Sequence, residues 1–199
     1  MKSRTNSFDV RKMTYLAIMT ALVVVLQFAG GFIRFGMFSI SLVLVPIIVG
    51  AAICGPLAGA WLGCVFGLMV FATGDAAAFL SIDPFGTVVT VMLKGILAGL
   101  ASGLTFHLLR KFNKYVAVYA AAVVCPVVNT GIFILGSLVF FMDTIAEWAG
   151  TMSAVQYIFV ALVGLNFFVE LGINLLLAPA IVTLIKFVPE IRAARKAAK

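Results

Sequence analysis

Long uncharged apolar runs, separated by short polar or charged breaks, dominate the chain. The first run, Met13 to Ile33, follows a basic head, exceeds the core of a signal peptide and ends without a small-x-small cleavage site, so we expect a retained helix. The next uncharged stretch, Phe35 to Gly74, is too long for one membrane crossing. Gly55-Pro56 interrupts it, which predicts a hairpin of two helices with proline in the first turn of the second.

Three further runs follow. A polar interval from Gly74 to Pro84 precedes the fourth helix, and a basic loop around Lys111 precedes the fifth. The sixth run continues past Glu170 with Pro179 inside, where we expect a kink or a helix that leaves the bilayer. The pattern predicts one all-α integral membrane domain over residues 1–199, a bundle of six transmembrane helices at about 12–33, 39–54, 57–73, 85–109, 115–141 and 153–187.

The composition excludes a water-soluble globular domain. Hydrophobic residues make up 64% of the 199 residues and charged residues only 11%, and the mean hydropathy is +1.21. Because a spanning helix uses about 20 apolar residues, the spans consume nearly the whole chain. No room is left for a soluble catalytic domain.

The charges predict the topology. Lys and Arg outnumber Asp and Glu by 14 to 7. With six crossings, both termini and the loops 55–56 and 110–114 share one side, which then holds all the basic clusters. The opposite side receives Arg34 and two acidic loops, with Asp75 and Asp83 in one and Asp143 and Glu147 in the other. The positive-inside rule therefore places both termini in the cytoplasm, and the basic balance implies no nucleic-acid partner.

Several polar residues fall inside the predicted spans. A charged side chain at mid-bilayer costs on the order of 3 kcal/mol, so Lys94 and Glu170 need partners or a cavity. Asn166, Glu170 and Asn174 recur every four residues and share one stripe of the sixth helix, and Asn129 in the fifth helix could meet that stripe. Two interpretations stay open: a buried Lys94–Glu170 pair that fixes helix packing, or a polar ligand pocket.

Small residues recur at helical spacing. Gly55, Gly59, Gly63 and Gly67 form one series and Gly95, Gly99 and Gly103 another, which predicts close helix packing. Ala17 and Ala21 form a similar face on the first helix, for packing within the bundle or for docking a second membrane protein. Thr87 and Thr90 are expected to bond carbonyls of their own helix.

The sequence contains no pattern that is typical of a catalytic site. The single histidine, His107, lies beside Arg110 at a helix end, and no HExxH, nucleophile elbow or P-loop occurs. The cysteines Cys54, Cys64 and Cys125 lie in apolar surroundings without ligand-like spacing, as packing residues do. We therefore expect no enzyme, no cofactor and no metal site.

The chain resembles the substrate-binding S components of energy-coupling factor (ECF) vitamin transporters. The resemblance covers nearly the whole chain and rests on the order and spacing of the segments KMTYLAIMTALVVVLQF, VPIIVGAAICGPLAGAWLGCVFGL, LSIDPFGTVVTVMLKGILAGLASGL, CPVVNTGIFILG and NFFVELGINLLLAP. It implies six helices in a bacterial cytoplasmic membrane and a vitamin bound near the outer face. A transmembrane coupling subunit and two ATPases would drive its release inward, as the S component topples.

The resemblance also assigns roles to residues. Ala17 and Ala21 would contact the coupling subunit. The gate loops would be Arg34 to Ser39, with Phe35 and Phe38, and Gly74 to Pro84, with Asp75, Phe79 and Asp83. Pocket residues would come from Arg34, Lys94, Asn129, Asn166, Glu170 and Asn174. We expect an apolar and aromatic wall around them, with Phe35, Phe38, Phe79 and Phe85 as candidates.

The segments GPLAGAWLGCVFGL and LKGILAGL look most like pantothenate-type and generic members. A carboxylate such as pantothenate would suit Lys94 and Arg34, whereas a neutral vitamin such as riboflavin would suit a site in which Glu170 neutralises Lys94. The aromatic clusters of folate, thiamin or biotin members are not evident in the sequence. Two other classes stay open: a self-sufficient small carrier or channel, and a membrane scaffold that transports nothing.

Overall fold

The computed structural model describes residues 10–30, 34–35, 38–39 and 42–197, of which 11, 34–35, 38–39, 165 and 186–197 are described by their backbone alone. The elements are, in chain order, α1 (Val10–Gly30), β1 (Arg34–Phe35), β2 (Phe38–Ser39), α2 (Leu44–Cys54), α3 (Pro56–Ala72), α4 (Ala77–Leu80), α5 (Pro84–Leu109), α6 (Lys114–Phe140), α7 (Met142–Ala149), α8 (Ala154–Tyr157), the π-helical segment η1 (Ile158–Gly164) and α9 (Leu165–Ala197).

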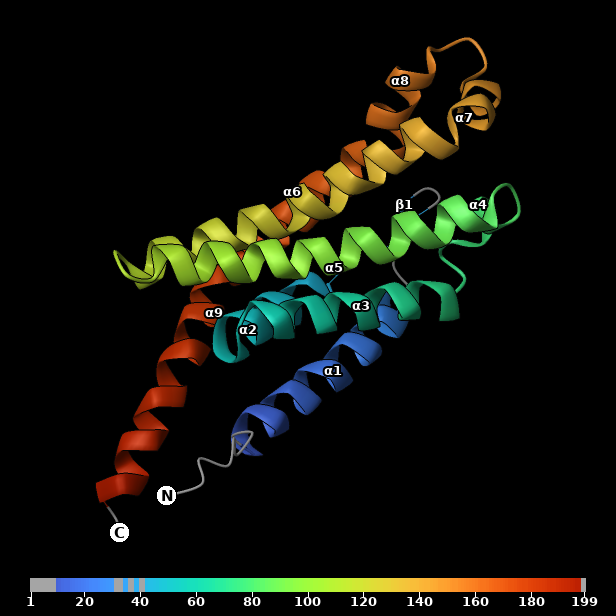
Figure 1. Ribbon diagram of the computed structural model, residues 1–199. Coiled ribbons are helices and arrows are strands. Elements are labelled where there is room, and N and C mark those ends of the chain that lie inside the picture. Colours follow the sequence, from blue (N-terminus) through green and yellow to red (C-terminus); the bar gives the residue numbers. More distant parts are fainter. Residues whose placement is uncertain (1–9, 31–33, 36–37, 40–41, 198–199) are drawn as a thin grey trace, which may run out of the picture.

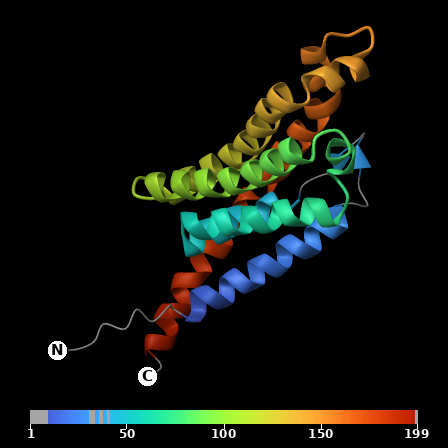
Figure 2. The ribbon, with the colours of Figure 1, turned by 45° about the vertical axis from the view of Figure 1, so that its right-hand side comes forward.

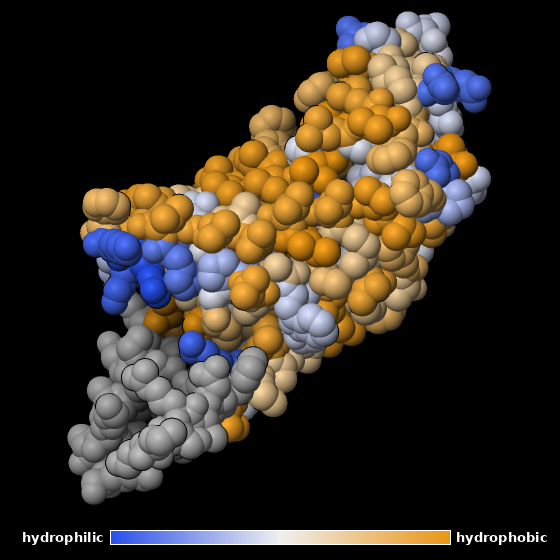
Figure 3. Space-filling model, in the orientation of Figure 1, coloured by the Kyte–Doolittle hydropathy of each residue, from blue (hydrophilic) through white to orange (hydrophobic). Residues whose placement is uncertain are grey.

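The protein is an elongated helical bundle (Figures 1 and 2). The start of α1, the end of α9 and the α2–α3 and α5–α6 turns lie at one end, which we call the terminal end; the β1–β2 hairpin, α4 and α7 lie at the other, the hairpin end. On the face that Figure 3 shows, most side chains between the two ends are hydrophobic, and the strongly hydrophilic ones lie near the ends.

Within the described chain, four helices are long and apolar enough to cross a membrane: Lys12–Gly30, Pro84–Leu109, Lys114–Phe140 and Ala154–Ile185. Two shorter apolar helices, Leu44–Cys54 and Pro56–Ala72, form the hairpin around Gly55-Pro56. The fold is therefore that of a helical membrane protein.

Local sequence explains the starts of α3, α5 and α6. Pro56 occupies the first turn of α3, where its missing N–H costs nothing, and Gly55 before it has a φ of +113°, which suits glycine. The Asp83 side chain accepts a hydrogen bond from the Gly86 amide at 3.0 Å and caps α5. Asn113 caps α6 in the same way.

Two predicted boundaries need correction. The helix predicted from residue 39 begins at Leu44, because a start at 44 puts Pro46 in the first turn, whereas a start at 39 would put it in the helix interior. The last helix does not end near residue 187 but runs through Pro179 to Ala197. Its irregularity lies upstream, in the π-helical turns of η1.

The predicted acidic loop around Asp143 and Glu147 is a helix, α7. Ile145 and Ala149, four residues apart, are buried, whereas Asp143 and Glu147 are exposed. This amphipathic spacing lets a short helix cover the hairpin end while its carboxylates stay in solvent.

The predicted glycine packing is confirmed at the α3–α5 interface. A Cβ placed on Gly63 would collide with the Gly95 carbonyl, and one on Gly99 would collide with the Gly59 carbonyl. The two backbones touch, as the four-residue spacing requires.

Candidate functional site

A cavity of about 80 Å³ lies between α1, α3, α4, α5, α6, η1 and α9. One buried water needs about 10–15 Å³, so the cavity is large enough for several waters or a polar ligand group. Its polar lining residues are Gln27, Asp75, Thr87, Thr90, Lys94, Asn129, Thr130, Asn166 and Glu170. Its aromatic lining residues are Phe66, Phe79, Phe133, Phe141 and Phe167.

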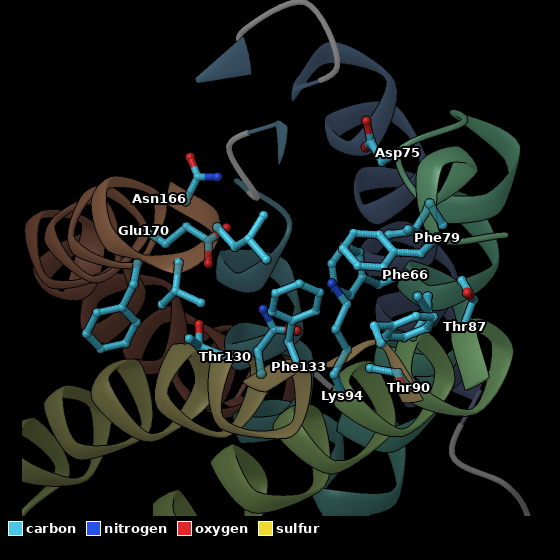
Figure 4. A pocket seen from close by; sticks show the side chains of 18 of the residues that line it. Phe66, Asp75, Phe79, Thr87, Thr90, Lys94, Thr130, Phe133, Asn166 and Glu170 are labelled. Atoms are coloured by element: carbon cyan, nitrogen blue, oxygen red, sulfur yellow. The ribbon is translucent and has the colours of Figure 1, made fainter. Parts of the chain in front are cut away.

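Lys94 brings a cation into this cavity. Its Nζ lies 5.7 Å from the centre of the Phe66 ring and 5.5 Å from that of Phe133, within the range of cation–π attraction. The Glu170 and Asp75 carboxylates also attract the ammonium. Figure 4 shows Lys94 rising from α5, with Glu170 and Asn166 on α9 across the cavity.

Three buried polar atoms at the cavity lack a hydrogen-bond partner within the described part of the chain: Thr90 Oγ1, Asn129 Oδ1 and Asn166 Oδ1. Leaving such a group unsatisfied costs about 1–3 kcal/mol. Helix packing alone does not explain this cost, whereas a ligand that donates or accepts hydrogen bonds would offset it.

The aromatic wall includes one of the four predicted candidates, Phe79, and rings that the sequence did not single out. The Phe79 ring on α4 makes edge contacts with Phe133, Phe141 and Trp148, at centroid distances of 5.8, 5.0 and 5.7 Å. These rings come from distant parts of the sequence and meet only in the fold. The fold therefore forms an aromatic cluster that is not evident in the sequence.

Gln27 was also missed. It is 3% exposed, and its Nε2 donates a hydrogen bond to Asp75 Oδ2 at 2.8 Å. Nothing in the apolar pattern of α1 separates this glutamine from a lipid-facing one. Gln27 follows Val23 by four residues and so shares its helix face, which is buried in the fold. A polar residue within an apolar span was the only signal in the sequence.

The structure brings most of the predicted pocket residues together. Lys94, Asn129, Asn166 and Glu170 all line the one cavity, together with the predicted gate residues Asp75 and Phe79.

The remaining predicted residues lie elsewhere. Asn174 is 1% exposed but does not line the cavity, and both of its side-chain polar atoms lack a partner among the described residues. Asp83 caps α5, and Phe85 is 72% exposed and contacts Phe140 instead of forming the wall. The side chains of Arg34, Phe35 and Phe38 lie outside the described part of the structure.

Two threonines behave differently. Thr87 donates to the Asp83 carbonyl of its own helix at 2.7 Å, as expected. Thr90 does not, because its hydroxyl has no partner among the described groups. Thr90 therefore belongs with the candidate ligand contacts.

His107 shows no sign of catalytic placement, since its Nδ1 lies 2.9 Å from the Gly103 carbonyl of its own helix. Among the described residues, no group of three or more His, Cys, Asp or Glu side chains is placed to hold a metal ion. The described lining of the cavity combines hydrogen-bonding side chains, the Lys94 ammonium, the Asp75 and Glu170 carboxylates and aromatic rings.

The family model of the ECF transporter substrate-specific component matches residues 11–182. The comparison with curated proteins gave no match. The match includes every described residue of the cavity wall. The chain is therefore a membrane-embedded transport subunit and no enzyme, and it belongs to the family of ECF transporter substrate-specific components.

Proposed function

We propose that this protein binds a vitamin or related micronutrient in the Lys94 cavity and delivers it inward as the S subunit of an ECF-type importer. The main support is that one cavity lined by aromatic rings contains Lys94 together with unpartnered polar atoms. These atoms belong to Thr90, Asn129 and Asn166. A transmembrane coupling subunit and two ATPases supply the energy.

We propose six crossings of a bacterial cytoplasmic membrane, with both termini in the cytoplasm. The two short helices α2 and α3 then serve as spans beside the four long ones. In support, the basic loop Arg110–Lys114 lies at the terminal end and the acidic helix α7 at the hairpin end, which agrees with the positive-inside rule. The cavity wall formed by Asp75, Ala76 and Phe79 then lies toward the outer face.

The lining charges bear on the ligand. Pantothenate, which the sequence favours, brings a carboxylate toward Lys94. In the described lining, however, that ammonium is already attracted by two carboxylates, those of Glu170 and Asp75. Together with the aromatic rings, this balance favours the alternative, a neutral vitamin with a ring system such as riboflavin.

The first experiment expresses the chain alone, purifies it in detergent and identifies any co-purified small molecule by mass spectrometry. A stoichiometric vitamin supports the proposal and names the ligand. Titration of the ligand-free protein with pantothenate and with riboflavin then compares the two affinities directly. A protein that binds neither and carries nothing favours the scaffold, and uptake that survives loss of the ATPases favours the self-sufficient carrier or channel.

The coupling surface is proposed on α1. Ala17 and Ala21 are exposed on one side of the helix, where small residues allow a partner helix to approach closely. Ala17→Leu with Ala21→Leu should abolish vitamin uptake by cells and leave the Kd of the purified protein within about twofold, because the larger side chains block docking alone.

The matched control is Ala180→Leu, at an exposed alanine of α9. This variant should transport normally. Full uptake by the Ala17 and Ala21 double variant would remove the docking assignment and leave the pocket assignment intact.

A further inference from the structure

The segment 74–83, which we call the α4 segment, forms the cavity wall at the hairpin end. Asp75, Ala76 and Phe79 all line the cavity. The helix within it, Ala77–Leu80, has only 4 residues. A helix this short is not stable by its own backbone hydrogen bonds, so side-chain contacts with the rest of the protein must fix its position.

One such contact comes from α1. The Gln27 amide donates to Asp75 Oδ2 at 2.8 Å and lies 3.4 Å from Thr73 Oγ1, whose hydroxyl is in turn 3.1 Å from the same carboxylate oxygen. Gly74, between Thr73 and Asp75, has a φ of +76°, a turn that glycine adopts at no steric cost. Figure 4 shows Asp75 beside α1, apart from Lys94.

This contact is buried on the Gln27 side and partly exposed on the Asp75 side. Gln27 is 3% exposed, and a hydrogen bond to a charged acceptor is stronger than one between neutral groups. The contact joins residues 48 positions apart in the chain, so it fixes the α4 segment relative to a different helix. The aromatic packing of Phe79 holds the other end of the segment.

We propose that Gln27 is a positioning residue that holds the α4 segment closed over the cavity by binding Asp75. The inference rests on the proposed function, in which this cavity receives the ligand. The helix that holds the segment is also the one that exposes Ala17 and Ala21, so the docking face and the cavity wall are joined through one rigid element.

The test uses the full-length chain in detergent with Trp61→Phe as the background. The chain has 2 tryptophans, so this change leaves Trp148, which contacts Phe79 at a centroid distance of 5.7 Å, as the only fluorophore of its kind. It also removes the indole hydrogen bond from Trp61 on α3 to Thr20 on α1, so comparison of this background with the wild type shows the effect of loosening α1 at a different contact. The readouts are amide hydrogen exchange of residues 76–83 and acrylamide quenching of Trp148.

In this background, Gln27→Leu should raise amide exchange in residues 76–83 by about tenfold or more and increase the quenching of Trp148. Thr73→Val, a milder change, should act in the same direction with a smaller effect. The swap Gln27→Glu with Asp75→Asn restores a donor opposite an acceptor and should return exchange to within about threefold of the background. Unchanged exchange in Gln27→Leu, or a swap variant as open as Gln27→Leu, would overturn the proposal.

These readouts need no ligand. Failure of the proposed function would therefore show as absent vitamin binding with the exchange pattern intact. Failure of the Gln27 proposal would show as unchanged exchange with vitamin binding intact. Where a vitamin binds, its dissociation rate should rise in Gln27→Leu and recover in the swap, which a purely structural role of Gln27 would not produce.

Discussion

The two sides of α5 carry opposite kinds of contact. On one side, Gly95 and Gly99 touch the backbone of α3 so closely that no Cβ fits between them. On the other side, Thr90 and Lys94 face a cavity with unpartnered polar atoms. Lys94 and Gly95 are adjacent in the sequence, yet Lys94 lines the cavity and Gly95 contacts the backbone of α3.

The difference separates stability from binding. Close dispersion contacts stabilise the glycine interface, and any added side-chain atom destabilises it by a steric clash. The cavity side keeps unpartnered polar groups that cost stability, and in the proposed function a ligand satisfies them. Substitutions at the two sides should therefore differ in kind: the glycine side should change folding and the cavity side should change affinity.

The largest effect is expected at the glycine interface. Gly63→Ala should lower the stability of the purified protein by about 3 kcal/mol or more, because the added Cβ collides with the Gly95 carbonyl. The midpoint of thermal unfolding in detergent should fall by about 6–12 °C. Gly131→Ala is the matched control, since a Cβ there meets nothing within 4 Å. Equal midpoints for the two variants would show that the helices do not touch.

A large effect on binding is expected at Lys94. Lys94→Met should weaken vitamin binding by about 30-fold or more, because it removes from the cavity the cation that Glu170 and Asp75 attract and that lies over the Phe66 and Phe133 rings. Lys94→Met with Glu170→Gln should recover much of any lost stability but not the affinity, as isothermal titration and thermal unfolding can measure. Lys114→Met, at an exposed lysine of the α5–α6 turn, should change neither. Wild-type affinity in the Lys94 variant would show that Lys94 and Glu170 have a purely structural role.

An intermediate effect should separate two buried asparagines. Asn129 lines the cavity and Asn174 does not, although both have unpartnered polar atoms in the described structure. Asn129→Leu should weaken binding by about 5–30-fold, whereas Asn174→Leu should leave the Kd within about twofold. Neither should be less stable than the wild type, since each removes an unsatisfied polar group. If both variants weakened binding alike, the ligand would extend deeper along α9 than the cavity does.

The smallest effect is expected for two threonines on one face of α5. Thr90→Val removes an unpartnered hydroxyl from the cavity and should weaken binding by about 3- to 5-fold. Thr87→Val removes a hydroxyl that already bonds the Asp83 carbonyl and should leave affinity unchanged. Titration of the two variants in parallel provides the measurement, and a reversed order would place the ligand nearer α4.

The sequence by itself determined the class of protein and much of the site. Lys94 and Glu170 stood out because a charge in an apolar span is expensive wherever the helices lie. The glycine series predicted close packing for a similar reason, since its spacing places the small residues on one helix face. These inferences need only local periodicity and the cost of transfer into the membrane.

Only the tertiary structure decided which of these residues meet. In a chain that is apolar almost throughout, the hydrophobic pattern does not specify which helices are neighbours, so the pairing of Gln27 with Asp75 could not be inferred. The same holds for the aromatic wall, whose rings come from α3, α4, α6 and α9. Asn129 and Asn174 look alike in sequence, and their different roles arise from the fold, which opens a cavity beside one and packs the other.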